Sequence, residues 1–201
     1  MKSPIKKSIP LRKLVGTAVL SALATVLMML SFGLPFVPVF LKWDFSELPA
    51  LLASFAYGPV YGVFVCLVKN LINAFFSSTM GIGELSNFLL GSMFVFISGI
   101  IYKKHHSFKG AVAGSLIGNT VMSFWGVFTN YCIIYPLFGI VLHYSSEAIL
   151  GMYQAIYPGL TSMITALLLV NVPFTFVKGL FSVIITFLIY KRISPLLKGK
   201  K

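Results

Sequence analysis

The chain has 201 residues, of which 58% are hydrophobic and 10% are charged. Soluble domains are usually about 45–50% apolar and about 25% charged, so this composition indicates an integral membrane protein without a separate soluble domain. The net charge of +12 comes mainly from basic clusters that flank apolar runs. That pattern is typical of membrane topology signals and excludes an ordinary nucleic-acid-binding surface.

The first apolar run extends from Leu14 to Phe36 and predicts a membrane-spanning helix. A basic segment followed by apolar residues and Ala22-Leu23-Ala24 also resembles a secretory signal with its cleavage site. The apolar run continues past that point, which favours the spanning helix.

The run from Leu48 to Phe76 is too long for one crossing and contains Gly58-Pro59 at its middle. This dipeptide interrupts helices, so the run predicts two short helices joined by a turn at residues 57–59. The split also places the basic loop from Lys103 to Lys109 on the cytoplasmic side, as the positive-inside tendency requires.

The remaining apolar runs complete an all-α membrane fold with six spans and both termini in the cytoplasm. Proline is favoured at the first helical position, so the last span is expected to begin at Pro173. Residues 136–172 are expected to form an outer loop and a short helix, which either leads into the last span or folds back over the core and the ligand site considered below. The predicted spans of this single membrane domain are residues 14–36, 48–57, 60–76, 85–102, 111–131 and 173–190.

Lys178 is a cation inside the last apolar run, 13 residues before Lys191. Helical rise places it about 10 Å inside the outer edge of the hydrocarbon layer. Thr175 and Asn171 share its helix face, and Asn130 reaches a similar depth on another helix. Intramembrane ionisable groups indicate functional sites, so these residues predict a ligand site open to the outer side, although Lys178 could also be an interfacial lysine.

The roles of the other charged residues can be interpreted in two ways. Lys69, beside Asn70, could tie helices together, for instance by pairing with Glu84, or could contact a ligand. Asp44, Glu47 and Glu84 fall in predicted loops, where solvated or helix-capping carboxylates are expected.

Small residues four positions apart predict close helix contacts, at Ala18 and Ala22 on the first helix and at Gly114 and Gly118 on the fifth. Their role could be internal packing or docking of another protein. No histidine or cysteine spacing predicts a metal site, and no nucleophile and base pair predicts an enzyme. A phosphate-binding loop for nucleotide hydrolysis is also missing from the sequence.

Five segments together resemble the riboflavin-binding S-component of energy-coupling factor transporters, from about Leu11 to Arg192. They are FLKWDFSELPALLASFAYGPVYGVFVCLVKNLIN, GIGELSNFLLGSMF, SFKGAVAG, FTNY and PFTFVKG. The resemblance implies a substrate-capture subunit in the bacterial plasma membrane. Such a subunit takes riboflavin from outside and works with a transmembrane coupling protein and two cytoplasmic ATPases.

The resemblance also implies roles for individual residues. Asn130 and Lys178 would contact the flavin, and the segment from Leu41 to Leu48 would help to close the site. Ala18 and Ala22 would dock on the coupling protein. Riboflavin would be the transported ligand and no cofactor is implied; the expected ligand contacts are Asn130, Lys178, Thr175, Asn171, Leu41, Trp43, Asp44 and Phe45.

Thr175 departs from the family pattern, which has asparagine at this position. A hydroxyl has one donor and lacks the two-sided pairing of an amide, so the affinity or the flavin recognised could differ. The alternatives are an S-component for flavin mononucleotide or another vitamin, a proton-coupled carrier, and a membrane enzyme. The outer loops carry one lysine against four carboxylates, which disfavours an anionic flavin.

Overall fold

The computed structural model describes residues 11–198, with side chains for residues 11–189. Of the basic clusters, Lys2, Lys6, Lys7, Lys200 and Lys201 lie outside the described residues. The elements are α1 (Leu11–Met29), β1 (Phe32–Gly33), β2 (Lys42–Trp43), α2 (Glu47–Tyr57), α3 (Pro59–Ala74), α4 (Ile82–Lys104), α5 (Phe108–Thr129), η1 (Asn130–Ile134), α6 (Tyr135–Leu142), α7 (Ser146–Gln154), α8 (Met163–Ala166), η2 (Leu167–Asn171) and α9 (Val172–Lys198).

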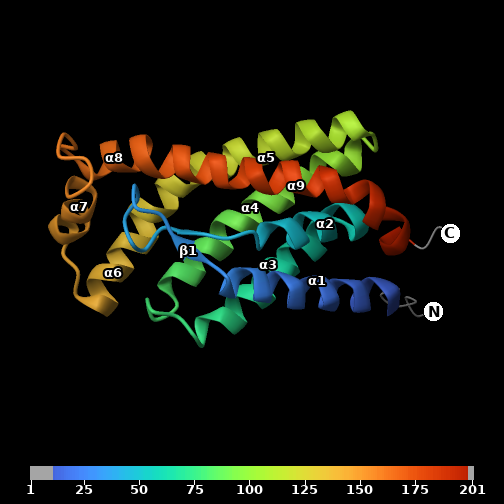
Figure 1. Cartoon of the computed structure of the whole chain (residues 1–201), viewed down its shortest axis with the longest axis horizontal. Coiled ribbons are helices and arrows are strands. Elements are labelled where there is room, and N and C mark those ends of the chain that lie inside the picture. The colour runs from blue at the N-terminus through green and yellow to red at the C-terminus, as the bar shows by residue number, and fades with distance from the viewer. Residues whose placement is uncertain (1–10, 199–201) are drawn as a thin grey trace, which may run out of the picture.

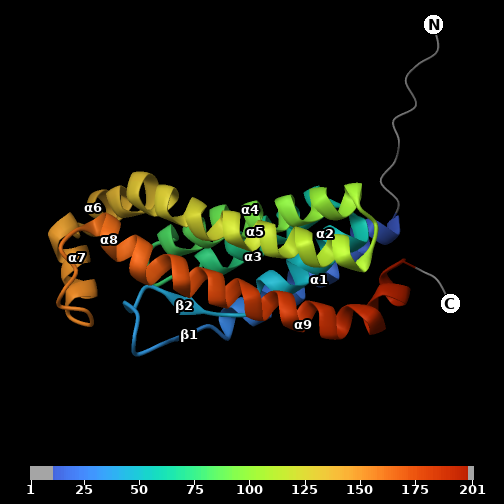
Figure 2. The ribbon, with the colours of Figure 1, turned by 90° about the horizontal axis from the view of Figure 1, so that it is seen from above.

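The helices lie along the long axis of an elongated bundle (Figure 1). At one end, called here the terminal end, α1 begins and α9 ends. At the other, called the cap end, α6, α7 and α8 cover the bundle (Figures 1 and 2). Helix α2 lies inside and packs against α1, α3, α4 and α9. The predicted all-helical class is therefore confirmed, apart from one two-stranded hairpin.

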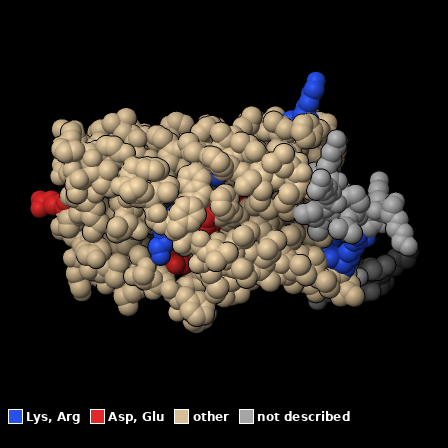
Figure 3. Space-filling view, in the orientation of Figure 1, with Lys and Arg blue, Asp and Glu red and all other residues tan. Residues whose placement is uncertain are grey.

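Four helical stretches are long and apolar enough to cross a membrane: Leu11–Met29, Ile82–Lys104, Phe108–Leu142 and Met163–Ile189. Helix α3 is also apolar but shorter. Few charged side chains reach the face shown in Figure 3, where a small group of red and blue atoms lies in a hollow near the middle. The apolar exterior agrees with a membrane environment.

The predicted break at Gly58-Pro59 is confirmed, because α2 ends at Tyr57 and α3 begins at Pro59. Gly58 has φ 119°, a backbone conformation that residues with a Cβ atom rarely adopt. The turn lies at the terminal end, where the Tyr57 ring reaches Gly16 of α1. A glycine at position 58 thus lets two short helices fold back on each other.

Small residues allow close packing of α4 on α5, as the Gly114 and Gly118 spacing predicted. A Cβ atom on Gly114 would lie 2.9 Å from the Ser98 carbonyl oxygen, and one on Gly118 would lie 2.8 Å from the Phe94 carbonyl oxygen. Around this contact, the rings of Phe55, Tyr102 and Phe187 fill the terminal end. The terminal end is therefore a close-packed core.

One predicted boundary is confirmed only in part. Helix α9 begins at Val172, one residue before the predicted start at Pro173, but it continues a helical stretch that begins at Met163. A proline inside a helix lacks one N–H and crowds the preceding turn. Here a π-helical turn relieves both problems: η2 (Leu167–Asn171) precedes Pro173, and η1 (Asn130–Ile134) precedes Pro136 in the same way.

The first helix is also shorter than predicted, since α1 ends at Met29 and not near Phe36. The following segment, residues 30–46, is called the lid. In the lid β1 and β2 pair antiparallel, with Phe32 opposite Trp43 and Gly33 opposite Lys42. The hairpin lies alongside α9 (Figure 2). Apolar residues in the lid therefore do not extend the helix.

Aromatic contacts attach the lid to the cap end. The Phe40 ring lies 5.8 Å from the rings of Phe138 and Tyr153, measured between centroids. The Trp43 ring packs edge-on against Phe174 at 5.8 Å and Phe181 at 5.5 Å, both on α9. The Phe40 ring thus attaches the lid to α6 and α7, and the Trp43 ring attaches it to α9.

Candidate ligand-binding site

A cavity of about 480 Å³ lies between the lid and the cap-end halves of the surrounding helices. Its wall combines aromatic rings with amide, hydroxyl and charged groups from the lid, α4, η1, α6 and α9. The lining side chains that matter most below are Phe40, Leu41, Asp44, Glu47, Glu84, Ser86, Asn87, Asn130, Tyr135, Phe138, Phe174, Thr175 and Lys178. An apolar cavity with a few polar groups is the usual form of a small-molecule site.

The structure brings five of the eight expected ligand contacts to this cavity: Asn130, Thr175, Lys178, Leu41 and Asp44. Trp43 lies instead on the outer side of the lid, where it lines a separate apolar groove with Phe174 and Val177. Phe45 and Asn171 do not line the cavity either. Trp43, Phe45 and Asn171 therefore lie outside the cavity lining, and their contact with a ligand stays a prediction.

Asn171 forms hydrogen bonds with two buried tyrosines at the cap end. Its amide nitrogen donates to the Tyr135 hydroxyl at 3.2 Å, and its carbonyl oxygen accepts from the Tyr153 hydroxyl at 2.7 Å. The two tyrosine hydroxyls are 2.5 Å apart. Asn171 is the last residue of η2, directly before α9. Its bonds therefore join the start of α9 to α6 and α7, and they fix the Tyr135 ring in the cavity wall.

Several polar groups in the wall are open to a ligand. The side-chain oxygen of Asn130 accepts from the Ser86 hydroxyl at 3.2 Å, and no described residue forms a hydrogen bond with its side-chain amide nitrogen. None of the hydrogen bonds among described residues involves the Thr175 hydroxyl. The Asn87 side-chain oxygen also has no partner in the described part of the chain, but it is fully buried and not open to the cavity. The open groups favour a ligand that supplies the missing partners.

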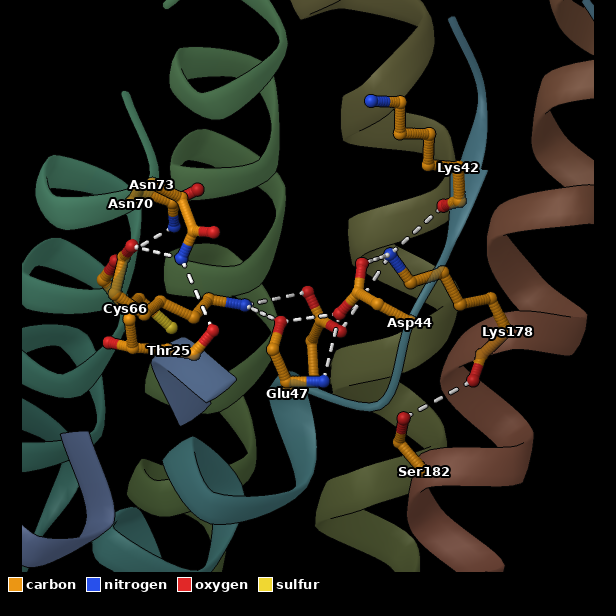
Figure 4. A network of polar contacts seen from close by, with 11 residues as sticks. Thr25, Lys42, Asp44, Glu47, Cys66, Asn70, Asn73, Lys178 and Ser182 are labelled. Atoms are coloured by element: carbon orange, nitrogen blue, oxygen red, sulfur yellow. Dashed lines mark hydrogen bonds and ion pairs between the residues drawn. The ribbon is translucent and has the colours of Figure 1, made fainter. Parts of the chain in front are cut away.

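Four charged residues form a closed network, called here the charge ring (Figure 4). Lys178 on α9 lies 2.7 Å from Asp44 Oδ2 and 3.8 Å from Glu47 Oε2. Lys69 on α3 lies 3.1 Å from Glu47 Oε1 and donates to the Ser46 hydroxyl. Two ammonium groups and two carboxylates balance, so the ring is neutral despite its burial.

The charge ring corrects two expectations. Asp44 and Glu47 are only 3% and 4% exposed, so they are not solvated loop carboxylates. Lys69 is fully buried and pairs with Glu47, whereas Glu84 accepts from the Ser77 hydroxyl at 2.5 Å. Isolated lysines in apolar helices need counter-charges, and the chain has four acidic residues in all.

Asp44 is the ring member that belongs to the lid. Burial alone would raise the pKa of this carboxyl, but the nearby ammonium groups of Lys178 and Lys69 lower it from 3.8 to about 2. The backbone N–H and hydroxyl of Ser46 also donate to Asp44 Oδ1, at 2.8 and 2.5 Å. Asp44 therefore stays ionised at neutral pH and holds the lid to α9.

The two alanines expected to dock a partner lie on the outside of α1. Ala18 and Ala22 are exposed, whereas the opposite face of α1 buries Leu20 and Ala24. Internal packing therefore does not explain their spacing. Large apolar neighbours such as Val19 and Leu23 are exposed as well, so the alanines form a shallow strip on an apolar helix face.

A metal centre has no counterpart in the described residues, where no group of three or more histidine, cysteine or acidic side chains lies together. Within that part of the chain, Cys66 is buried and Cys132 is exposed, and both are free thiols.

Comparison with known proteins shows the family of the chain. The family model for the substrate-specific component of ECF transporters matches residues 12–190. The chain belongs to this family of membrane transport subunits. It is a multi-pass protein of the bacterial cell membrane and not an enzyme.

Individual relatives match over almost the whole chain. The riboflavin transporter RibU of Staphylococcus aureus is 35% identical over 93% of both chains, and the riboflavin transporter FmnP of Bacillus subtilis is 30% identical over 94% of this chain and 96% of its own. A solved structure, described as the S component of a bacterial ECF transporter, aligns with a TM-score of 0.73 and 34% identity. That alignment covers 93% of this chain and 98% of the solved one.

Proposed function

We propose that the chain is the riboflavin-binding subunit of an ATP-driven energy-coupling factor transporter. The observation that carries the proposal is the cavity of about 480 Å³ beneath the lid, with Asn130, Thr175 and Lys178 in one wall. Its volume falls within the range of roughly 300–1,000 Å³ typical of small-molecule sites. Relatives named as riboflavin transporters, over nearly the full length, support the same ligand.

The chemistry of the wall suits a flavin. Its ring system offers carbonyl oxygens and an N–H along its edge and a large flat face. The amide of Asn130, the hydroxyl of Thr175 and the ammonium of Lys178 can bond the edge. The rings of Phe40 and Tyr135 can pack on the face. Riboflavin is then a transported ligand, and no cofactor is required.

The charges in the wall favour riboflavin over flavin mononucleotide. Three carboxylates, Asp44, Glu47 and Glu84, line the cavity beside two lysines, Lys42 and Lys178. Lys178 is already paired with Asp44, and Lys42 contacts the Ser78 hydroxyl at 3.4 Å. Because the charge ring is neutral, Lys42 is the lysine of the wall left to attract a phosphate, and the Glu84 carboxylate in the same wall opposes it.

Six helical crossings with both termini in the cytoplasm fit this function. The proposal counts α2 and α3, a hairpin that returns at Gly58, as two short crossings beside the four long stretches. The basic connection between α4 and α5 and the Gly58 turn lie at the terminal end, which would face the cytoplasm. The cavity then opens to the outside, where riboflavin is captured.

Transport itself requires partners. The chain would work with a transmembrane coupling subunit, which docks on the strip of Ala18 and Ala22, and with two cytoplasmic ATPases. Release of riboflavin to the cytoplasm would depend on that assembly. Uptake that stops when the proton gradient collapses at constant ATP would identify a proton-coupled carrier instead.

The direct test is an absorption spectrum of the detergent-purified protein followed by a riboflavin fluorescence-quenching titration. We expect flavin absorption, or saturable quenching at about one riboflavin per chain that excess flavin mononucleotide does not reverse. A colourless protein without quenching would contradict the proposal and direct the search to other vitamins. Reversal by flavin mononucleotide would change the ligand but keep the site.

A further inference from the structure

Lys69 is the most enclosed charged residue that the structure describes, yet it does not line the cavity. Its exposure is 0%, and it lies on α3 behind the carboxylates of the cavity wall. Its ammonium donates to the Ser46 hydroxyl and to Glu47 Oε1. Burying a cation is unfavourable unless it is well paired, so this position needs an explanation beyond packing.

Two routes connect Lys69 with Lys178 on the opposite side of the charge ring (Figure 4). One passes through Ser46, which donates to Asp44 Oδ1, and through Asp44 Oδ2, which accepts from Lys178 at 2.7 Å. The other passes through Glu47, whose two carboxylate oxygens face the two lysines separately. The charge of Lys69 therefore affects which carboxylate the Lys178 ammonium pairs with.

Glu47 is the part of the ring that can compete for Lys178. Its Oε1 bonds Lys69, while its Oε2 lies 3.8 Å from the Lys178 ammonium and has no hydrogen bond among the described residues. Without Lys69, one ammonium would face two buried carboxylates. The flexible stem of Lys178 would let it move towards Glu47, away from Asp44.

We propose that Lys69 is a positioning residue for the ligand site. By neutralising Glu47, it leaves Lys178 bonded to Asp44, so that the Lys178 ammonium stays at the cavity wall and the lid stays attached to α9. The inference deepens the proposed riboflavin function and rests on it. It also assigns a role to an intramembrane lysine that touches no ligand.

A double-mutant cycle tests the charge balance. Lys69→Met should weaken riboflavin binding about tenfold or more in the quenching titration, although residue 69 lies outside the cavity. Glu47→Gln in the same chain should recover most of that loss, because Lys178 and Asp44 then form a neutral pair again. The single variant Glu47→Gln completes the cycle, and Lys109→Met, at an exposed lysine far from the ring, should bind as the parent does.

A merely structural role for Lys69 predicts a different result. If the lysine only fills space, the losses from Lys69→Met and Glu47→Gln would add, and the double variant would bind no better than Lys69→Met. That outcome would overturn the inference. If Lys69→Met fails to fold, the neutral double variant carries the test, and it must fold and bind riboflavin.

A second readout needs no riboflavin. In a Trp125→Phe background, Trp43 is the remaining tryptophan, and its ring packs on Phe174 and Phe181 of α9. Lys69→Met should loosen the lid and shift Trp43 emission to longer wavelength, and Glu47→Gln should reverse the shift. This pattern in a protein that binds no riboflavin would reject the proposed function alone. Unchanged emission and affinity in Lys69→Met would reject the positioning role alone.

Discussion

The terminal end of the bundle is filled by apolar side chains and brought together by small residues, whereas the cap end encloses a cavity and buries charge. At the terminal end, glycines of α5 allow backbone contact with α4, and the eight residues of α2 that follow Glu47, from Leu48 to Phe55, are all buried. At the cap end, two helices pass through π-helical turns, and the lid is held by rings and ion pairs.

This difference separates stability from binding within one chain. Close packing leaves no void, so a change at the terminal end should act mainly on the free energy of unfolding. A cavity lined by unpaired amides and a neutral charge ring contributes less packing, but it offers partners to a ligand. Substitutions at each end test how far the two ends are independent.

The largest effect on stability is expected from Gly118→Ala at the terminal end. The added Cβ atom would lie 2.8 Å from the Phe94 carbonyl oxygen, and backbone cannot move aside as a side chain can. We expect a loss of about 3 kcal/mol, the upper end of the usual overpacking effect. Thermal unfolding followed by circular dichroism in detergent measures it.

Gly151→Ala is the matched control, because a Cβ atom on this cap-end glycine would meet nothing within 4 Å. It should leave the protein as stable as before or stabilise it by up to about 1 kcal/mol, since alanine is the better helix former. Equal melting temperatures for the two alanine variants would show that α4 and α5 are not closely packed in the membrane protein.

At the cap end, Asn130→Ala and Lys178→Ala should each weaken riboflavin binding by about 1 to 3 kcal/mol through the loss of a buried hydrogen bond, and Lys178→Ala the more of the two, because it also leaves Asp44 without its ammonium partner. Fluorescence-quenching titrations of the purified variants measure the change. Both proteins should still fold, because neither residue belongs to the terminal-end core. Unchanged affinity in both variants would remove the proposed site.

The predictable parts of the fold followed from composition and from residues with strong local preferences. Apolar run lengths predicted the helices, Gly58-Pro59 predicted the break between α2 and α3, and the Gly114 and Gly118 spacing predicted a close helix contact, which the structure shows to be with α4. Each of these signals acts within one segment or through one helix face. The depth argument for Asn130, Thr175 and Lys178 also placed three residues in one cavity.

The errors arose where distant segments meet. Asp44 and Glu47 precede or begin a helix and look like solvated loop residues, and their burial depends on Lys69 and Lys178 from two other helices. Pro173 was predicted as the first residue of the last span. The π-helical turn that joins it to the preceding helical residues cannot be predicted from the proline alone. The sequence did contain one signal for the charge ring: two lysines lie within apolar runs and need counter-charges, and the chain has four carboxylates that could supply them.

A smaller effect is expected from Thr175→Asn, which restores the residue of the family pattern. The side chain is buried at the cavity wall and makes no hydrogen bond to the described residues, so an amide can add one partner for the ligand without breaking an existing bond. Riboflavin affinity should rise by about 1 kcal/mol. Thr175→Val, of similar size and without a hydroxyl, should lower it, and a titration that ranks valine above asparagine would contradict this role.

The smallest effect on both stability and binding is expected from Ala18→Leu and Ala22→Leu. Both alanines are exposed on α1, away from the cavity, so the purified variants should melt and bind riboflavin as the parent does. Riboflavin uptake by cells and co-purification with the coupling subunit should nevertheless fall, since leucine removes the close approach that alanine permits. Leu23→Ala on the same face, which makes a side chain smaller, should preserve assembly. Normal uptake by both leucine variants would mean that the coupling subunit docks elsewhere, and the exposed strip on α1 would then face only lipid.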